Sequence, residues 1–292
     1  GTTPTRGRTP CSSPGRYGRA MPFRRPRFVN GRILHNGGHG IFYRMEVSIP
    51  DRIEFLPGQF AMVSGWPGND PLLPRPLAIF RSGGARGKGT VEFVYKVVGR
   101  GTALLSGLHD GDPLQITLPL GNGFDLGRED RTWWLVGGGV GFSTVFPAAV
   151  VLEAQRAEFE VFLGARSRDQ LPPREWVPGG GAPGRAHLCT DDGTAGFFGR
   201  VTDVVRERMA RLKAPETARL TILACGPREM LKEIAELALP REVPVQASLE
   251  NHMACGFGVC WGCVTAVRDG EKTAYRRVCK EGPVFDAREV VW

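Results

Sequence analysis

The stretch Cys255-Gly256-Phe257-Gly258-Val259-Cys260-Trp261-Gly262-Cys263 decides how the C-terminal part of this chain folds, and Cys279 completes it from a distance. The spacing, C-x4-C-x2-C followed by x15-C, is the plant-type ligand spacing of a [2Fe–2S] cluster. The glycines of the stretch lack a Cβ, so the loop can curve tightly and bring backbone N–H groups close to the sulfur atoms. We predict that a [2Fe–2S] cluster, a carrier of single electrons, is bound by Cys255, Cys260, Cys263 and Cys279.

Two other uses of these cysteines stay open. A zinc site more typically has paired C-x2-C units or a mixture of Cys and His, whereas here one pair is spaced by four residues and His252 lies outside the run. Disulfides could also join any four cysteines. A zinc-stabilised binding module with a vestigial nucleotide fold is therefore the alternative from another functional class.

Composition bounds the remaining possibilities. A chain of 292 residues, 41% of them hydrophobic, can form two domains and a small third module. Its 40 glycines and 23 prolines favour a β-rich protein with many turns. No apolar run approaches the 18 or so residues of a membrane span. We predict an α+β multidomain protein.

The N-terminal segment carries most of the formal charge of +8, since the residues from Thr5 to Arg27 include seven arginines and no acidic residue. We predict that residues 1–26 form a disordered basic tail, with Met21 as a candidate start and a nucleic-acid arm as the alternative. The tail lacks the apolar core of a secretory signal. Iron–sulfur ligands without an export signal favour the reducing cytoplasm.

Short alternating runs follow and predict an antiparallel β-barrel over residues 27–127. The predicted strands are Gly31–Leu34, Ile41–Ile49, Gln59–Val63, Pro76–Phe80, Thr90–Val97 and Asp112–Thr117.

Two features of this barrel suit a dinucleotide cofactor. Arg75 stands between two prolines, which fix the backbone around a guanidinium that can bind a phosphate with two hydrogen bonds. Gly99-Arg100-Gly101-Thr102 follows the strand end Val94-Tyr95-Lys96 and begins an apolar helical pattern, whose first N–H groups suit a pyrophosphate. The alternative is an ordinary capped helix.

Residues 128–245 predict a parallel α/β domain that binds a nucleotide. The strand Trp133–Val136, the turn Gly137-Gly138-Gly139-Val140-Gly141 and the helix Phe142–Arg156 have the order that such a unit requires. Ligands bind at the carboxyl ends of parallel strands, and Cys225-Gly226-Pro227 follows such a strand. The segment after the second strand contains Arg166 and Arg168 instead of the usual acidic residue, so NAD and NADP both stay open. We further expect strands at Phe159–Leu163, His187–Thr190 and Thr221–Ala224, and helices at Thr202–Leu212 and Arg228–Leu239.

Together these features resemble the ferredoxin-reductase-like superfamily and, within it, the electron-transfer subunits of NAD-dependent dihydroorotate dehydrogenases. The most specific likeness lies in residues 246–292, a small [2Fe–2S] module that closes with Arg277-Val278-Cys279-Lys280-Glu281-Gly282-Pro283. The resemblance implies FAD bound by Arg75, Pro76, Leu77, Ala78, Val94, Tyr95, Lys96, Gly101 and Thr102. One departure is Ala78, because the first flavin motif commonly ends in Ser or Thr.

The resemblance also implies a function and a partner. An FMN-containing catalytic subunit would oxidise dihydroorotate, and electrons would pass through the cluster and FAD to NAD in pyrimidine biosynthesis, in a heterotetramer of two catalytic and two electron-transfer subunits. NAD would lie near Gly137, Gly138, Gly139, Gly141, Cys225, Gly226 and Pro227. No residue need act as an acid or base. Cys225 could equally be a buried structural cysteine.

The resemblance leaves one further reading of the same architecture, the diaphorase subunit of a hydrogenase or of a ferredoxin:NAD(P) oxidoreductase. In either case the cluster must face its partner. We therefore expect an apolar interface at Phe257, Val259 and Trp261, although these side chains could instead shield the cluster from water.

Overall fold

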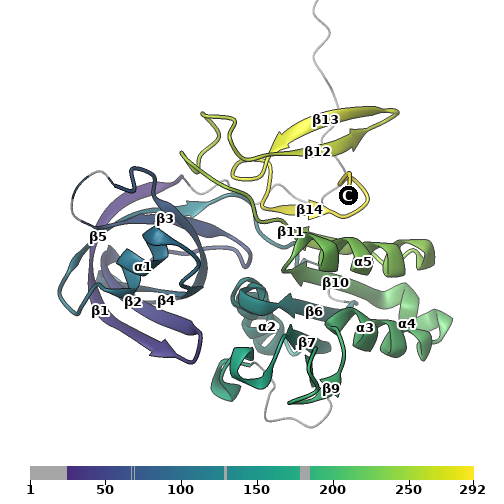
Figure 1. Cartoon of the computed structure of the whole chain (residues 1–292). Coiled ribbons are helices and arrows are strands. Elements are labelled where there is room, and N and C mark those ends of the chain that lie inside the picture. Colours follow the sequence, from purple (N-terminus) through teal and green to yellow (C-terminus); the bar gives the residue numbers. More distant parts are fainter. Residues whose placement is uncertain (1–24, 67, 69, 128–129, 178–184) are drawn as a thin grey trace, which may run out of the picture.

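The computed structural model describes residues 25–66, 68, 70–127, 130–177 and 185–292. Three parts are visible: a β-barrel, a sheet covered by helices, and a C-terminal segment that lies beside both (Figure 1). The predicted fold class is confirmed. Apart from Arg25 and Pro26, the predicted tail lies outside the described residues, as does Met21. Among the helices described, none is long and apolar enough to cross a membrane.

Five antiparallel strands close the barrel in the order β1-β2-β4-β3-β5. The predicted strands Pro76–Phe80 and Thr90–Val97 both lie within β4, which is continuous as a strand assignment although the chain reverses direction near Gly84, where φ is +83° and a Cβ would lie 1.9 Å from the Lys88 carbonyl oxygen. The first part of β4 pairs with β3 and its last part with β2, so one strand serves two neighbours. The strands are β1 (Arg27–His39), β2 (Phe42–Asp51), β3 (Phe60–Ser64), β4 (Arg75–Lys96) and β5 (Pro113–Leu120).

The helix α1 (Arg100–Ser106) follows β4 directly and packs its apolar side on the barrel core. Leu105 is fully buried, and Leu104 and Leu108 pack against the same cluster. The Asn36 amide of β1 donates to the carbonyls of Leu105 and Leu108 at 2.8 and 2.9 Å, which satisfies backbone groups at the end of the helix.

The second part is a seven-stranded sheet with the order β14-β11-β10-β6-β7-β8-β9. All neighbouring pairs are parallel except β11 and β14. The strands are β6 (Thr132–Gly138), β7 (Phe159–Ala165), β8 (Ala186–Thr190), β9 (Phe197–Phe198), β10 (Leu220–Cys225), β11 (Val245–Ser248) and β14 (Val284–Asp286). The helices are α2 (Phe142–Ala154), α3 (Val201–Ala210), α4 (Ala214–Arg219) and α5 (Arg228–Ala238), with short 3-10 turns at Gly139–Gly141, Arg168–Gln170, Arg174–Trp176 and Leu239–Arg241.

The helix α2 lies between the sheet and the barrel, which explains why its sequence is apolar on every side. Phe146 of α2 stacks on Phe80 of β4 with 4.1 Å between ring centroids, and Phe142 meets Phe42 of β2 at 5.1 Å. Barrel and sheet therefore share one hydrophobic core.

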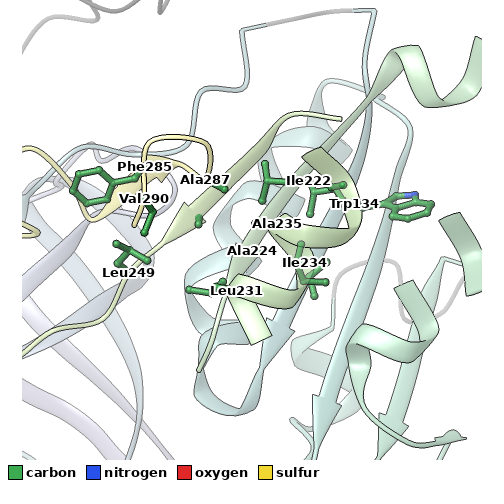
Figure 2. Close-up of a cluster of buried hydrophobic side chains, with 14 of the residues drawn as sticks. Trp134, Ile222, Ala224, Leu231, Ile234, Ala235, Leu249, Phe285, Ala287 and Val290 are labelled. Carbon is green, nitrogen blue, oxygen red and sulfur yellow. The ribbon is translucent and has the colours of Figure 1, made fainter. Parts of the chain in front are cut away.

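The C-terminal segment is also joined to the rest of the protein by buried contacts. Its hairpin, β12 (Val264–Asp269) with β13 (Lys272–Arg277), stands apart, but β14 pairs with β11 as an edge strand of the sheet. Figure 2 shows side chains of β10, α5 and this segment in one cluster, including Leu249, Phe285 and Val290. The same cluster contains Met62 and Leu120 of the barrel, so all three parts meet in it.

Candidate functional site

The four predicted ligands lie as two neighbouring pairs of thiols. Cys255 contacts Cys260, and Cys263 contacts Cys279, in each case by a hydrogen bond between side chains. Backbone N–H groups also donate to sulfur, from Val259 to Cys255 and from Cys279 to Cys263, each at 3.4 Å. A [2Fe–2S] cluster with four cysteine ligands needs two thiolates for each iron. The two pairs of cysteines fit this requirement.

The two pairs differ in their surroundings. Cys260 is exposed, whereas Cys263 and Cys279 are buried. Partial burial opposes ionisation of Cys255, but N–H groups of Cys260, Phe257 and Val259 stabilise its thiolate, so its pKa is lowered. Burial, and then the neighbouring Cys263, raise the pKa of Cys279. Over the described parts of the chain, no three or more Cys, His, Asp or Glu side chains are placed to hold a single metal ion.

The cysteine loop packs directly on the barrel. Gly256 has a φ of +77°, and a Cβ on it would lie 2.2 Å from Cγ of the buried Met62. Met62 lies on β3, where it pairs with Pro76 of β4. The loop that carries the cysteines therefore touches the strand next to the predicted flavin motif.

The first predicted flavin residues lie around the start of α1. The Arg75 guanidinium lies so close to Gly101 that a Cβ there would come within 2.1 Å of Nε. Arg75 also donates to the carbonyl of Leu73 at 2.7 Å and lies 5.7 Å from the ring centre of Trp66. The Thr102 hydroxyl bonds Val98 and Gly99, which caps the helix. The Arg75 guanidinium and the first residues of α1 therefore lie side by side. This is the arrangement that binding a pyrophosphate requires.

The strand residues of the predicted flavin site differ in where their side chains lie. Leu77 and the Tyr95 ring face the barrel core, and the Tyr95 hydroxyl donates to Asn36 at 3.0 Å. Ala78 pairs with Phe60 in the ladder between β3 and β4. Val94 packs on the core that joins barrel and sheet. Any contact of Tyr95 with a flavin must therefore use its backbone, because its side chain is buried elsewhere.

The two predicted nucleotide segments meet at the carboxyl ends of β6 and β10, where Gly137 pairs with Cys225. A Cβ on Gly141 would lie 2.2 Å from the Cys225 carbonyl oxygen, and one on Gly138 would lie 2.9 Å from Cδ of Pro227. Gly226 has a φ of +158° and lies against Gly138. Side chains at these glycines would collide with neighbouring atoms, so glycine lets the turn after β6 and the segment after β10 pack closely together at the edge where ligands of such sheets bind.

Cys225 is the last residue of β10, and its thiol is buried beside these glycines. Burial, and then the charge of Glu250, raise its pKa to about 12, although hydrogen bonds with Thr144 and Ser248 lower it. The thiol is therefore neutral at physiological pH and unsuited to act as a nucleophile. The Cys225 side chain is 1% exposed and belongs to the core shared by barrel and sheet.

Two cations lie near the glycine turn. Lys96 is the last residue of β4, and its Nζ lies 3.6 Å from the place that a Cβ on Gly139 would occupy. Burial and the charge of nearby Arg166 lower the pKa of Lys96. Since Arg166 follows β7 and Lys96 comes from the barrel, two parts of the fold supply positive charge to one place, which suits the phosphates of a dinucleotide.

Three exposed apolar side chains lie close to the exposed Cys260 in the sequence and define what we call the apolar patch. It consists of Phe257, Val259 and Trp261, which are 51%, 70% and 55% exposed. Large apolar side chains are seldom exposed side by side in this way unless a partner covers them.

Several contacts of the site were missed by sequence reasoning. Met62 joins the cysteine loop to the flavin strand, and Arg277 and Glu281 join the two cysteine-bearing segments. Met62 carries no recognisable signal, and the stretch from Arg277 to Glu281, although part of the resemblance, does not reveal that Arg277 contacts Gly258, nineteen residues away.

Comparisons with known proteins agree with this geometry. The model of the iron-sulfur cluster binding domain of dihydroorotate dehydrogenase B matches residues 250–291. The dihydroorotate dehydrogenase B (NAD(+)) electron transfer subunit of Geobacillus kaustophilus is 39% identical over 237 residues, 80% of this chain and 86% of that protein. A homolog of that subunit from Aquifex aeolicus is 36% identical over 266 residues, 90% of this chain and 98% of that protein. A solved NADH-dependent reduced ferredoxin-NADP oxidoreductase has a TM-score of 0.74 at 26% identity and covers 90% of each chain.

Proposed function

This chain belongs to the family of dihydroorotate dehydrogenase B electron transfer subunits, and from that premise we propose that it passes electrons from a dihydroorotate-oxidising subunit to NAD. A cluster carries one electron, a nicotinamide exchanges two as hydride, and a flavin can do either. The protein is thus an oxidoreductase subunit that converts between single electrons and hydride.

One observation carries the proposal. The cysteine loop packs through Gly256 on Met62, and Met62 pairs in the barrel with Pro76. The three predicted sites therefore follow one another through the protein, with the cluster loop on the barrel and the barrel's Lys96 at the nucleotide corner. This order is the one that the proposed transfer needs.

The residues divide among three cofactors in this proposal. The four cysteines hold a [2Fe–2S] cluster, and Arg75 with the start of α1 holds the FAD pyrophosphate. Pro76, Leu77, Ala78, Val94, Tyr95, Gly101 and Thr102 line the flavin largely through backbone, because the Tyr95 ring and Leu77 are buried in the barrel. Gly137, Gly138, Gly139, Gly141, Cys225, Gly226 and Pro227 form the nicotinamide site, with NAD proposed over NADP because the relatives are named for NAD(+). Lys96 was predicted for the flavin site, but because it lies at the glycine turn beside Arg166, both cations pair with the phosphates of NAD in this proposal.

The partner in this proposal is an FMN-containing catalytic subunit, in a heterotetramer of two copies of each chain. It would cover the patch of Phe257, Val259 and Trp261, which brings it next to the exposed Cys260. We also keep the predicted division at residues 27–127, 128–245 and 246–292 as a proposal, noting that β11 begins at Val245 and β14 returns to the same sheet.

The test uses protein co-expressed with its catalytic partner and purified without oxygen. The complex should be brown, contain iron and FAD, and reduce NAD⁺ when given dihydroorotate. Replacing Cys260 by Ser should remove iron and leave FAD, while Cys189→Ser, a change at a buried cysteine of β8, should keep both. Full iron content in Cys260→Ser would contradict the ligand assignment, and colourless iron-free wild-type protein would contradict the function.

A second candidate keeps the architecture and changes the partner. The likeness to a ferredoxin-NADP oxidoreductase over 90% of the chain favours an iron–sulfur-rich partner such as a ferredoxin or hydrogenase. Co-purification distinguishes the two, because one partner forms orotate from dihydroorotate and the other does not.

A further inference from the structure

Arg277 contacts both segments that carry the cysteines. Its Nη1 donates to the Gly258 carbonyl at 2.6 Å, in the loop between Cys255 and Cys260. Its Nε and backbone N donate to the Glu281 carboxylate at 3.0 and 2.7 Å, and Nη2 makes a further bond to the same group. Glu281 follows Cys279 by two residues, so this ion pair ties the last cysteine to the loop of the other three.

The same guanidinium also holds Trp261. It lies 4.7 Å from the centre of the indole ring, a cation–π contact. Trp261 has a φ of +58°, a left-handed conformation that costs a side chain such as tryptophan free energy and persists only when its surroundings impose it. The stacking on Arg277 supplies such a constraint.

The charges of the pair lie beside the buried cysteines. Arg277 is within electrostatic reach of Cys263 and Cys279, and both charged side chains are partly exposed, at 24% and 28%. Solvent screens such charges only in part, so they still act on a group a few ångströms away. When a cluster gains an electron its net charge becomes more negative by one, so a nearby cation favours the reduced form and an anion opposes it.

We propose that the Arg277–Glu281 ion pair is a positioning unit for the cluster, which fixes the Gly258 carbonyl and the Trp261 ring and balances two opposite charges that together set the reduction potential. The inference rests on the proposed function, because it takes the four cysteines as ligands of a [2Fe–2S] cluster. The pair contributes no ligand itself. Its role is to fix the loop and its electrostatic surroundings.

The experiment measures the midpoint potential by dye-mediated titration, followed by the electron paramagnetic resonance signal of the reduced cluster. Glu281→Gln leaves the guanidinium without its counter-charge and should raise the potential. Arg277→Gln leaves the carboxylate without its counter-charge and should lower it. The double variant should return toward the wild-type value. Lys272→Gln removes one cation from the other end of β13 and should change the potential least.

A merely structural pair predicts a different result, because both single variants would then lose cluster or shift in the same direction. If the midpoint potentials of Glu281→Gln and Arg277→Gln shift in the same direction, or do not shift, the inference is overturned. If Arg277→Gln does not retain iron, Glu281→Gln is compared with Arg277→Lys, which keeps the charge balance but not the forked hydrogen bonds. The former must then have the higher potential, and an equal or lower value refutes the proposal. Wild-type protein without a cluster would instead refute the proposed function.

Discussion

Gly256 is the position at which the packing of the cysteine loop can be tested most sharply. Alanine at this position would have to adopt a left-handed conformation, which costs about 1–2 kcal/mol. Its Cβ would also lie 2.2 Å from Cγ of Met62 and 3.3 Å from Leu120, both buried. Relieving such a contact in a packed core costs about 1–3 kcal/mol. We therefore expect Gly256→Ala to lower the free energy of unfolding by about 2–5 kcal/mol.

The chain offers a matched control in the same loop. Gly262 has no positive φ, and a Cβ there would meet only Cys260 Sγ at 3.6 Å, an ordinary contact. Gly262→Ala should therefore keep wild-type stability and iron content. Because Met62→Ala itself costs about 2–5 kcal/mol by leaving a cavity, it serves as the reference for the double variant: relative to Met62→Ala, adding Gly256→Ala should cost only the part that comes from backbone strain.

The assay combines denaturant unfolding with iron determination on protein prepared without oxygen. Gly256→Ala should unfold at lower denaturant concentration and hold less iron than Gly262→Ala. Equal stability and equal iron in the two variants would show that the loop does not pack on Met62 as described. The proposed proximity of cluster and flavin would then lose its basis.

Three further predictions follow from the same structure. Gly141→Ala would place a Cβ 2.2 Å from the Cys225 carbonyl, so NADH oxidation with an artificial acceptor should fall at least tenfold while FAD content stays unchanged; weakened FAD binding would contradict the assignment. Phe80→Ala should cost about 3–5 kcal/mol in denaturant unfolding because it empties the core between barrel and sheet, whereas alanine at Phe198, which is 73% exposed, should cost little. The raised pKa of Cys189 and Cys225, about 12 against an ordinary 9.0, means that the unfolded chain loses these protons first. Stability should therefore fall from pH 9 toward 12, by about 1.4 kcal/mol per pH unit for each thiol, and an unchanged slope in the Cys189→Ala, Cys225→Ala variant would argue against it.

Sequence reasoning succeeded where the determining contacts are local. The spacing from Cys255 to Cys263 predicted a loop, and the structure has one. The strand, glycine turn and helix around Gly137–Gly141 were likewise predicted from neighbouring residues, and β6, a short 3-10 turn and α2 are found there. In the cysteine loop and the glycine turn, the local sequence alone determines the conformation of the backbone.

It failed where distant contacts decide. The buried orientation of the Tyr95 ring depends on Asn36 of β1, a partner that no local pattern reveals. The pairing of Arg277 with the Gly258 carbonyl is of the same kind.

The edge strand β14 has a consequence for how electrons can reach the flavin. Its hydrogen bonds to β11, and those of Asn122 to the carbonyls of Glu281 and Val284, anchor the cysteine-bearing segment to both the sheet and the barrel. A carrier on a free linker could swing between donor and acceptor, and its transfer rate would depend on viscosity. An anchored one cannot, so the distance between its redox centres is built into the folded state and the rate should be insensitive to solvent viscosity.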